Sequence, residues 1–307
     1  MQPPSPLSTQ TPQTAHTAAS ENLRGIIAMV VAVGCFSLMD AFLKTLAGSY
    51  PAMQVAALRG CAALPLVAGY VLWRGEVSRL LKVRWPLHLL RGLLNVSMLY
   101  LFAYALRELG LAEAYTLFFI APLLITALST VVLGEKVRAA HWVAIGLGLV
   151  GVLVALRPDQ QAFFSIGALA VLGAACAYAV SAITGRVLTR TASSASLVFW
   201  TTTFLALGAT TLAWPQWVDV AQAHWPLVAG LGITGFFGQV AITEAFRHGQ
   251  ASVVAPFEYT AIAWGLGLDW LLWQAVPGAW TLLGGAIIVG SGLYLVRQER
   301  TQMVLPP

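Results

Sequence analysis

The sequence predicts an all-α membrane protein with ten transmembrane helices, arranged as two inverted five-helix repeats. Three observations lead to this prediction. Of the 307 residues, 58% are hydrophobic and only 9% are charged, whereas a soluble domain carries roughly 25% charged residues. The apolar residues fall into ten runs, each about long enough to cross ~30 Å of hydrocarbon as a helix. The second half of the chain also repeats features of the first.

Short polar or charged connections separate the ten runs and define their ends. We expect every run to be a helix, because backbone exposed to lipid must satisfy its own hydrogen bonds and the runs lack the alternation of barrel strands. The runs cover residues 24–46, 51–73, 86–106, 111–133, 139–156, 164–188, 194–214, 226–247, 251–273 and 278–296.

The repeat is clearest when residues 105–158 are compared with the C-terminal part of the chain. Arg107 and Arg157 recur as Arg247 and Arg297, about 140 residues later. Internal repeats of this size are typical of secondary transporters. Because each repeat has five spans, an odd number, the second repeat enters the membrane from the opposite side. The halves should therefore be related by a pseudo-two-fold axis in the membrane plane.

Basic residues are distributed unequally between the two sides. On this topology Lys44, Arg107 and Arg157 lie on one side, Arg59 and Arg91 lie within spans, and the other twelve of the 17 Lys and Arg lie on the side of both termini. Connections rich in Lys and Arg stay in the cytoplasm. The sequence therefore predicts a multi-pass protein of the inner cell membrane with cytoplasmic termini. These connections also account for the net charge of +5, so no nucleic-acid partner is expected.

Four segments follow from this division. Residues 1–23 are expected to be a disordered cytoplasmic tail, since the first twenty are rich in Pro, Ser, Thr and Gln. Residues 24–157 and 158–297 are the two repeats, and 298–307 form a second cytoplasmic tail. The three cysteines lie within apolar runs, and the sequence has no Walker motif or metal-ligand spacing. No cofactor or metal is expected.

Several short motifs recur in a fixed order along the chain. They are FSLMDA (36–41), LAEAY (111–115), LGEK (133–136) and AFR (245–247). On ten spans with a repeat, this combination resembles the drug/metabolite transporter superfamily, EamA type, over nearly all of the chain after residue 24. The FSLMDA and LAEAY segments are most similar to the branch that includes S-adenosylmethionine uptake carriers. One departure is Gln274, which occupies the position taken to match Glu135, where the family often keeps an acid.

Ionisable side chains within spans are costly in hydrocarbon and are usually functional. Asp40 and Arg59 fall at similar depth in the first two spans, which predicts that they are partners. They could form an outer gate or a substrate contact, or a structural ion pair that orients the two helices.

A second set of polar residues lies in the inner halves of spans three, eight and nine. Arg91 and Asn95 share a face of the third span at i, i+4, and Arg91 could pair with Glu258 or with Glu244. We interpret Glu258 as the group that couples transport to a proton or to a cationic part of the substrate. The alternative is a fixed pair with Arg91 that braces the helices.

Aromatic and proline residues complete the predicted site. Tyr104, Tyr115 and Tyr259 are candidates for lining a pocket that holds a planar or amphipathic substrate. Pro122 and Pro256 lie inside spans, where each frees a backbone carbonyl and can serve as a hinge.

The resemblance implies a secondary transporter that moves small polar or amphipathic metabolites, of the amino-acid, nucleoside-like or vitamin class, by alternating access. Proton coupling and exchange both remain open as the energy source. A homodimer also remains open, because the small-residue pairs Ala144/Gly148 and Ala286/Gly290 suit helix packing within the chain or between chains. A receptor or scaffold is the main alternative. An intramembrane enzyme is disfavoured, since the sequence offers no HExxH, Ser–His or twin-acid motif.

Overall fold

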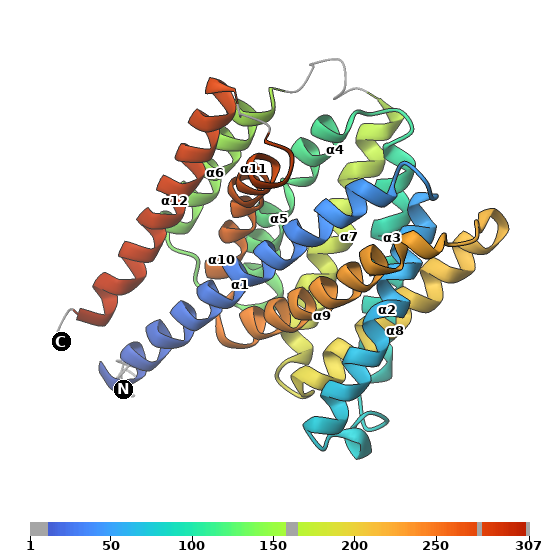
Figure 1. Cartoon of the computed structure of the whole chain (residues 1–307). Coiled ribbons are helices and arrows are strands. Elements are labelled where there is room, and N and C mark those ends of the chain that lie inside the picture. The colour runs from blue at the N-terminus through green and yellow to red at the C-terminus, as the bar shows by residue number, and fades with distance from the viewer. Residues whose placement is uncertain (1–11, 158–164, 275–277, 305–307) are drawn as a thin grey trace, which may run out of the picture.

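The computed structural model describes residues 12–157, 165–274 and 278–304, and the regular secondary structure of this part of the chain is helical (Figure 1). The predicted all-α membrane fold is confirmed. Within the described residues, nine helical stretches are long and apolar enough to cross a membrane. Eight of them are single helices: α1 (Pro12–Leu46), α2 (Ala52–Trp73), α3 (Trp85–Ala105), α6 (Ala139–Leu156), α7 (Ile166–Leu188), α8 (Ser194–Ala213), α9 (Trp225–His248) and α12 (Ala279–Val304).

The other two of the ten predicted spans are broken into pieces. The fourth is the remaining one of the nine stretches counted above, and the ninth is not among them. The fourth consists of α4 (Leu111–Phe118), α5 (Ala121–Leu128) and the π-helical turn η2 (Ser129–Leu133). The ninth consists of α10 (Ala251–Val254), the 3-10 turn η6 (Ala255–Tyr259) and α11 (Thr260–Trp273). Short 3-10 turns also occur in connections, at η1 (Val77–Arg79), η4 (Trp214–Gln216) and η5 (Gln222–His224).

Local sequence explains where several helices begin. The side chains of Ser165 and Ser193 accept hydrogen bonds from backbone N–H groups at the starts of α7 and α8, at 3.0 and 3.2 Å, as N-caps do. Proline occupies the first turn of α3 and α9, where no N–H is needed. At the two ends of the described chain, α1 begins at Pro12 and α12 continues to Val304. Residues 12–23 and 298–304, predicted as parts of the two tails, are thus helical and continue the outermost spans.

The breaks in the fourth and ninth spans are related by the repeat. Phe119 is the C-cap residue that follows α4, and Tyr259, about 140 residues later, ends η6; their rings lie 5.8 Å apart. Both spans finish in a left-handed residue, Gly134 at φ 67° and Gln274 at φ 52°. Gly134, and not Glu135, is therefore the structural counterpart of Gln274, which corrects the match made from sequence by one residue.

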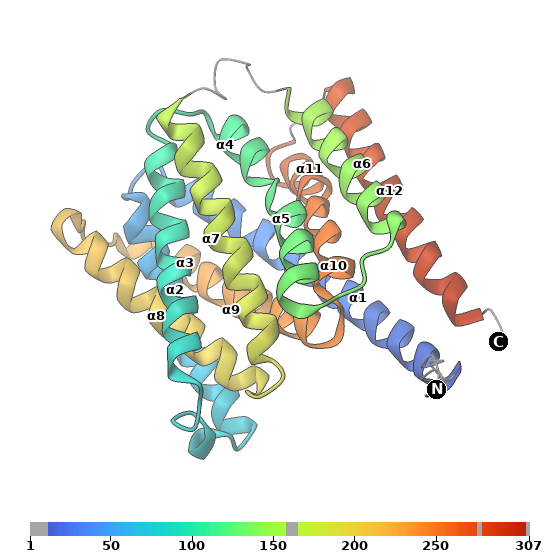
Figure 2. The same ribbon diagram turned by 180° about the vertical axis from the view of Figure 1, so that it is seen from behind.

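Helix packing follows a two-fold pattern. The most extensive pairs are α1 with α9, α3 with α7, α2 with α8, and α6 with α12. Each pair takes one helix from each half. When the two halves are exchanged, the α1–α9 pair maps onto the α3–α7 pair. The α2–α8 and α6–α12 pairs each map onto themselves. Both ends of the described chain lie on one side of the molecule, and α1 and α7 run in opposite directions (Figures 1 and 2). This is the arrangement of an inverted repeat.

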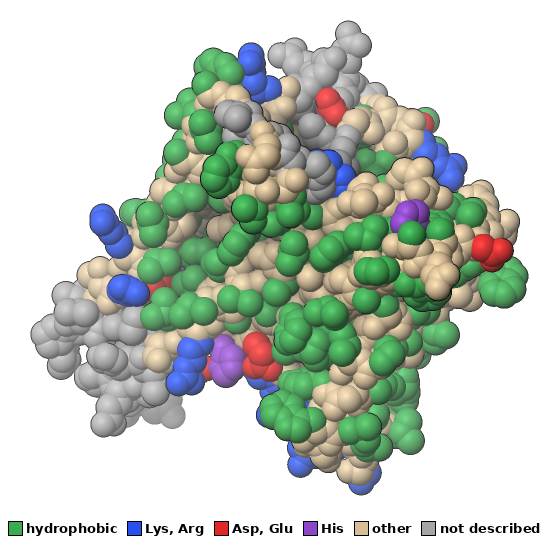
Figure 3. All heavy atoms as spheres, in the orientation of Figure 1, with side chains coloured by type: hydrophobic (Ala, Val, Ile, Leu, Met, Phe, Trp, Pro, Cys, Tyr) green, Lys and Arg blue, Asp and Glu red, His purple; other side chains and the backbone are tan. Residues whose placement is uncertain are grey.

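The outer surface is apolar where a bilayer would surround it. Hydrophobic side chains cover much of the face seen in Figure 3, while Lys, Arg, Asp and Glu gather toward its rims. Large exposed apolar residues include Leu72, Leu93, Val131, Leu169 and Leu271. In a membrane protein such residues contact lipid, so their exposure does not indicate a protein-binding patch.

Small residues allow α6 and α12 to approach closely. A Cβ atom built on Gly284 would lie 2.6 Å from the Cβ of Ala155 and would also meet the Gly151 carbonyl oxygen. By contrast, Ala286 and Gly290 lie on the exposed face of α12. Of the two small-residue pairs noted in the sequence, the second therefore points away from α6.

We expect Gly284→Leu to lower the unfolding temperature in detergent, because the added side chain would force α6 and α12 apart at a cost of about 1–3 kcal/mol or more. Gly290→Leu is the matched control on the same helix, since no described atom lies within 4 Å of a Cβ built there. Equal unfolding temperatures for the two variants would show that the α6–α12 contact does not stabilise the fold.

Candidate functional site

Asp40 and Arg59 face each other across α1 and α2 but are not in direct contact. The two half-buried charges interact electrostatically, yet no ion pair within 4.0 Å joins them among the described residues. The Arg59 guanidinium instead lies 5.5 Å from the centre of the Phe36 ring. The predicted pairing thus holds as proximity and not as a salt bridge.

A small polar cavity lies beside Arg59. Its walls include Thr201 and Thr202 of α8 and Gln239 of α9, and its volume is about 10 Å³. That is room for about one water molecule. In this arrangement the helices therefore leave no space for a metabolite next to Arg59.

Arg91 lies deep in the interior, on α3. Its side chain is buried, and within the described part of the chain its Nε and Nη1 atoms have no hydrogen-bond partner. Gly185 of α7 makes room for the guanidinium, because a Cβ there would lie 3.0 Å from Arg91 Cζ. No direct ion pair links Arg91 to Glu258 or Glu244 among the described residues.

Tyr178 of α7 interacts with both Arg91 and Glu258. Its hydroxyl donates a 3.0 Å hydrogen bond to Glu258 Oε1, and it also interacts electrostatically with Arg91. The direct Arg91–Glu258 pair considered from sequence is therefore not formed, and Tyr178, on the helix packed against α3, interacts with each of the two residues.

Two further contacts lie beside these three residues. Asn95 Oδ1 accepts a 2.7 Å hydrogen bond from the Ser181 hydroxyl, one turn along α3 and α7. The Phe118 ring of α4 lies 5.6 Å from the Tyr178 ring. We call Arg91, Asn95, Tyr178, Ser181 and Glu258 the central polar cluster.

The three tyrosines singled out from sequence lie in different places. Tyr115 contacts the Phe102 ring at 5.5 Å and lies within electrostatic range of Asp40. Tyr104 lies near the end of α3, with the Arg107 guanidinium 5.9 Å from its ring. Tyr259 is fully buried against α6 at Gly148, and its hydroxyl has no hydrogen-bond partner among the described residues. The structure thus brings none of the three into the central polar cluster.

Glu244 belongs to a different group, on the side of the termini. Its Oε2 lies 3.2 Å from His248 Nε2, and the other ring nitrogen of His248 contacts Glu21 of α1. The two ring nitrogens of His248 therefore each face a carboxylate. Glu244 lies only one turn from the end of α9, so it joins α9 to α1 instead of reaching Arg91.

A buried carboxylate, Glu299 of α12, lies at the centre of the neighbouring contacts. Glu299 is 1% exposed, accepts a 3.0 Å hydrogen bond from Asn22 Nδ2, and pairs with Arg138. His141 Nε2 lies 3.5 Å from the same carboxylate.

Nearby, Glu135 accepts hydrogen bonds from the backbone N–H groups of residues 251 and 252, at 2.9 and 3.0 Å. Together with the Glu299 contacts and the Glu21–His248–Glu244 contacts, these groups form what we call the termini-side network.

The opposite side is also held by contacts between the halves. Lys44 of α1 pairs with Asp269 of α11 at 3.1 Å. The Tyr50 hydroxyl lies 2.8 Å from His224 Nδ1, and the backbone N–H of Val218 donates to Gln54 Oε1 at 2.9 Å. The central polar cluster is therefore enclosed by inter-repeat contacts on both sides.

Sequence reasoning gave no specific role to Tyr178, Ser181 or Glu299. Tyr178 and Ser181 could be found from the sequence, because they are polar residues three positions apart on one face of an apolar helix. Glu299 lies beyond residue 296, where the apolar run ends. Within the described residues, no cluster of three His, Cys, Asp or Glu could hold a metal ion.

Comparison with known proteins gives a consistent result. A family model described as the EamA-like transporter family matches residues 23–157 and 165–297. The chain is 30% identical over 278 residues to the pseudopaline exporter of Pseudomonas aeruginosa, covering 90% of this chain and 97% of that one. It is 27% identical to the riboflavin transporter of Vibrio cholerae, with 90% and 94% covered. The identity is 24% to the S-adenosylmethionine uptake transporter of Rickettsia prowazekii, with 94% and 97% covered.

One solved crystal structure shares the fold. It superposes with a TM-score of 0.78, at 22% sequence identity, over 92% of this chain and 99% of the other.

Proposed function

The chain belongs to the EamA-like transporter family, and from this premise we propose that its central polar cluster binds a small zwitterionic metabolite during transport. The protein is a multi-pass membrane transporter of small metabolites and not an enzyme. The family resemblance found in the sequence is confirmed. The residues of the cluster support a substrate that carries both an amine and a carboxylate.

The observation that supports this proposal is that Arg91 is buried with two donor atoms unpaired among the described residues. A charged Arg inside a bilayer costs at least ~2.5 kcal/mol on insertion scales, and two of its donor atoms lack partners in the described structure. A substrate carboxylate would satisfy them with a charge-assisted pair of hydrogen bonds. Beside Tyr178, the Glu258 carboxylate offers a site for an ammonium group, and the Phe118 and Tyr178 rings offer an apolar surface for the rest of the molecule.

The packing supports alternating access. Contacts between the halves close the cluster from both sides, so a substrate enters only when one set opens. The broken fourth and ninth spans carry Pro122 and Pro256 beside their breaks, and these are the hinges in our proposal. Glu258 would exchange its proton for the substrate amine as access alternates, which makes proton coupling the favoured energy source and exchange the alternative.

The relatives leave direction and cargo open. They are named for three different metabolites, and for both export and uptake. An amino acid or a nucleoside-like compound with an amine and a carboxylate fits the cluster best.

We infer that both termini face the cytoplasm of a cell with the protein in its inner membrane, because most Lys and Arg of the connections lie on that side. Single cysteines at Ser78 and Gln216, in a variant without the three natural cysteines, test this orientation. Both positions are exposed, in the connections after α2 and α8. An impermeant maleimide added to whole cells should label only the cysteine at 216. Labelling of the cysteine at 78 from outside would reverse the orientation.

The transport proposal is tested in two steps with purified protein. A thermal-shift screen against metabolites identifies ligands, since a ligand stabilises the state it binds. The ligands found are then measured for flux into proteoliposomes. We expect zwitterions to dominate the ligands and to be transported. Binding without flux in either direction would favour a receptor, and ligands without a carboxylate would contradict the role given to Arg91.

A further inference from the structure

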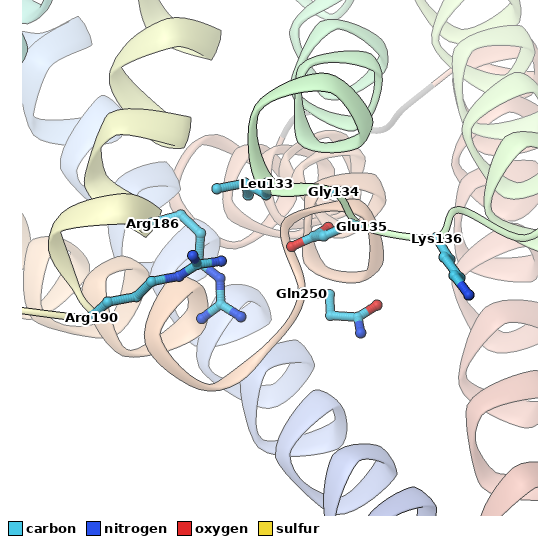
Figure 4. A pocket seen from close by; sticks show the side chains of 7 residues that line it. All are labelled: Leu133, Gly134, Glu135, Lys136, Arg186, Arg190 and Gln250. Atoms are coloured by element: carbon cyan, nitrogen blue, oxygen red, sulfur yellow. The ribbon is translucent and has the colours of Figure 1, made fainter. Parts of the chain in front are cut away.

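A second and larger hollow lies on the side of the termini, where the fourth span ends beside the end of α7 (Figure 4). Its volume is about 470 Å³, and its polar lining consists of Glu135, Lys136, Arg186, Arg190 and Gln250. Glu135 and Lys136 belong to the first half of the chain and the other three to the second. The hollow is separate from the central polar cluster, with which it shares no residue.

Arg186 is fixed in place at the wall of this hollow. Its Nη1 donates hydrogen bonds to the carbonyl oxygens of Phe246 and Arg247 at the end of α9, at 2.6 and 2.7 Å. Its Nε is buried and has no partner within the described residues. One edge of the guanidinium therefore holds α9, while another donor remains unused.

Arg190 lies one turn further along α7, and its guanidinium lies beside that of Arg186 (Figure 4). Arg190 is exposed, and the described structure gives its side chain no hydrogen bond or ion pair. Two like charges at i, i+4 repel each other. A bound anion between them would remove that repulsion and use the free donors.

Glu135 does not neutralise the pair. Its two carboxylate oxygens accept hydrogen bonds from the N–H groups of Ala251 and Ser252 and from the Ser252 hydroxyl, so they are directed at the start of α10. It attracts Arg186 through space without forming an ion pair among the described residues. Three basic side chains and one acid leave the lining with a net positive charge.

We propose that this hollow binds a phosphate group, held by Arg186 and Arg190. A tetrahedral phosphate offers oxygens to two guanidinium edges at once, whereas a carboxylate offers only two oxygens in one plane. The hollow is large enough to admit a phosphate attached to a larger molecule, either a free phosphorylated metabolite or a lipid headgroup. Both arginines belong to the end of α7, and Glu135 and Lys136 of the first half complete the lining around them.

The test measures thermal unfolding of the purified full-length protein with inorganic phosphate. We expect phosphate to raise the unfolding temperature of the wild type in a saturable way. For Arg190→Gln the dissociation constant should rise about tenfold, as expected for the loss of a charge-assisted contact. Arg79→Gln is the matched control, because Arg79 is exposed on the same side but lies outside the hollow.

A second series distinguishes the source of the phosphate. Delipidated protein is titrated with mixed micelles containing phosphatidic acid or, as a control, phosphatidylcholine. Saturable stabilisation by inorganic phosphate indicates a free phosphate ligand. Stabilisation by phosphatidic acid alone, again lost in Arg190→Gln, indicates a lipid headgroup. The proposal is overturned if neither ligand stabilises the wild type, or if Arg190→Gln responds as the wild type does. No flux is measured, so the outcome is independent of the proposed substrate site.

Discussion

Glu258→Gln is expected to abolish pH-dependent accumulation of substrate in proteoliposomes while leaving the protein folded. The glutamine keeps the size of the side chain and can still accept the hydrogen bond from Tyr178, so the packing is preserved. It loses the charge that would bind a substrate ammonium and the site that would carry a proton. Losing one partner of a buried charge pair costs ~2–5 kcal/mol, so initial rates should fall at least about 30-fold.

Two companion variants show whether the loss is specific to this carboxylate. Tyr178→Phe removes the hydrogen bond but keeps the acid, so it should retain pH-dependent flux at a reduced rate. Glu113→Gln changes an acid in the first turn of α4 and should behave as the wild type. If instead Glu258→Gln unfolds at lower temperature and its folded fraction transports with the original pH profile, then Glu258 only braces the helices.

Glu299→Gln should have the largest effect on stability and on the closure of the termini side. Glu299 is 1% exposed and binds Asn22, Arg138 and His141, so its charge is compensated by three partners. A neutral glutamine leaves the Arg138 guanidinium without a counter-charge and cannot satisfy all three groups. We expect a loss of about 2–4 kcal/mol in the free energy of unfolding.

The same change should open the termini side more often, because the network joins α12 to α1 and α6. A cysteine replacing Gln250, at the rim of that side, reports the opening by its rate of maleimide labelling. The rate should rise in Glu299→Gln and stay unchanged in Asp219→Asn, an exposed acid in the connection after α8 that lies outside the network. An unchanged labelling rate and unfolding temperature in Glu299→Gln would show that the network does not hold the closed state.

Much of the fold could be predicted from the sequence, because apolar runs report membrane spans directly. The fifth span, 139–156, has the predicted ends, and the second begins one residue later than predicted, at Ala52. Hydrophobicity does not report breaks, however. The ninth span satisfies the apolar pattern of a single helix, yet it is divided into α10, η6 and α11. Pro256 is the one sign of this division in the sequence.

The site was predicted less completely, for a geometric reason. Position along an apolar run gives the depth of a residue but not the direction in which its side chain points. Arg91 and Glu258 are predicted at similar depth, but no ion pair joins them among the described residues, and Glu258 accepts its hydrogen bond from Tyr178 of α7 instead. Glu244 has a comparable depth and points instead to His248. Which residues meet across two helices depends on the rotation of each helix about its own axis. That rotation is set by how the helices of the two repeats pack together.

If Arg91 binds the carboxylate of the substrate, ligands with and without that group should differ in affinity. The measurement is the dissociation constant of an identified zwitterionic ligand and of its carboxamide analogue, for the wild type and for Arg91→Gln. The wild type should bind the carboxamide at least about tenfold more weakly, and Arg91→Gln should bind both compounds equally weakly. If Arg91→Gln folds and still prefers the carboxylate by the wild-type factor, the carboxylate does not bind at Arg91 and the account is wrong.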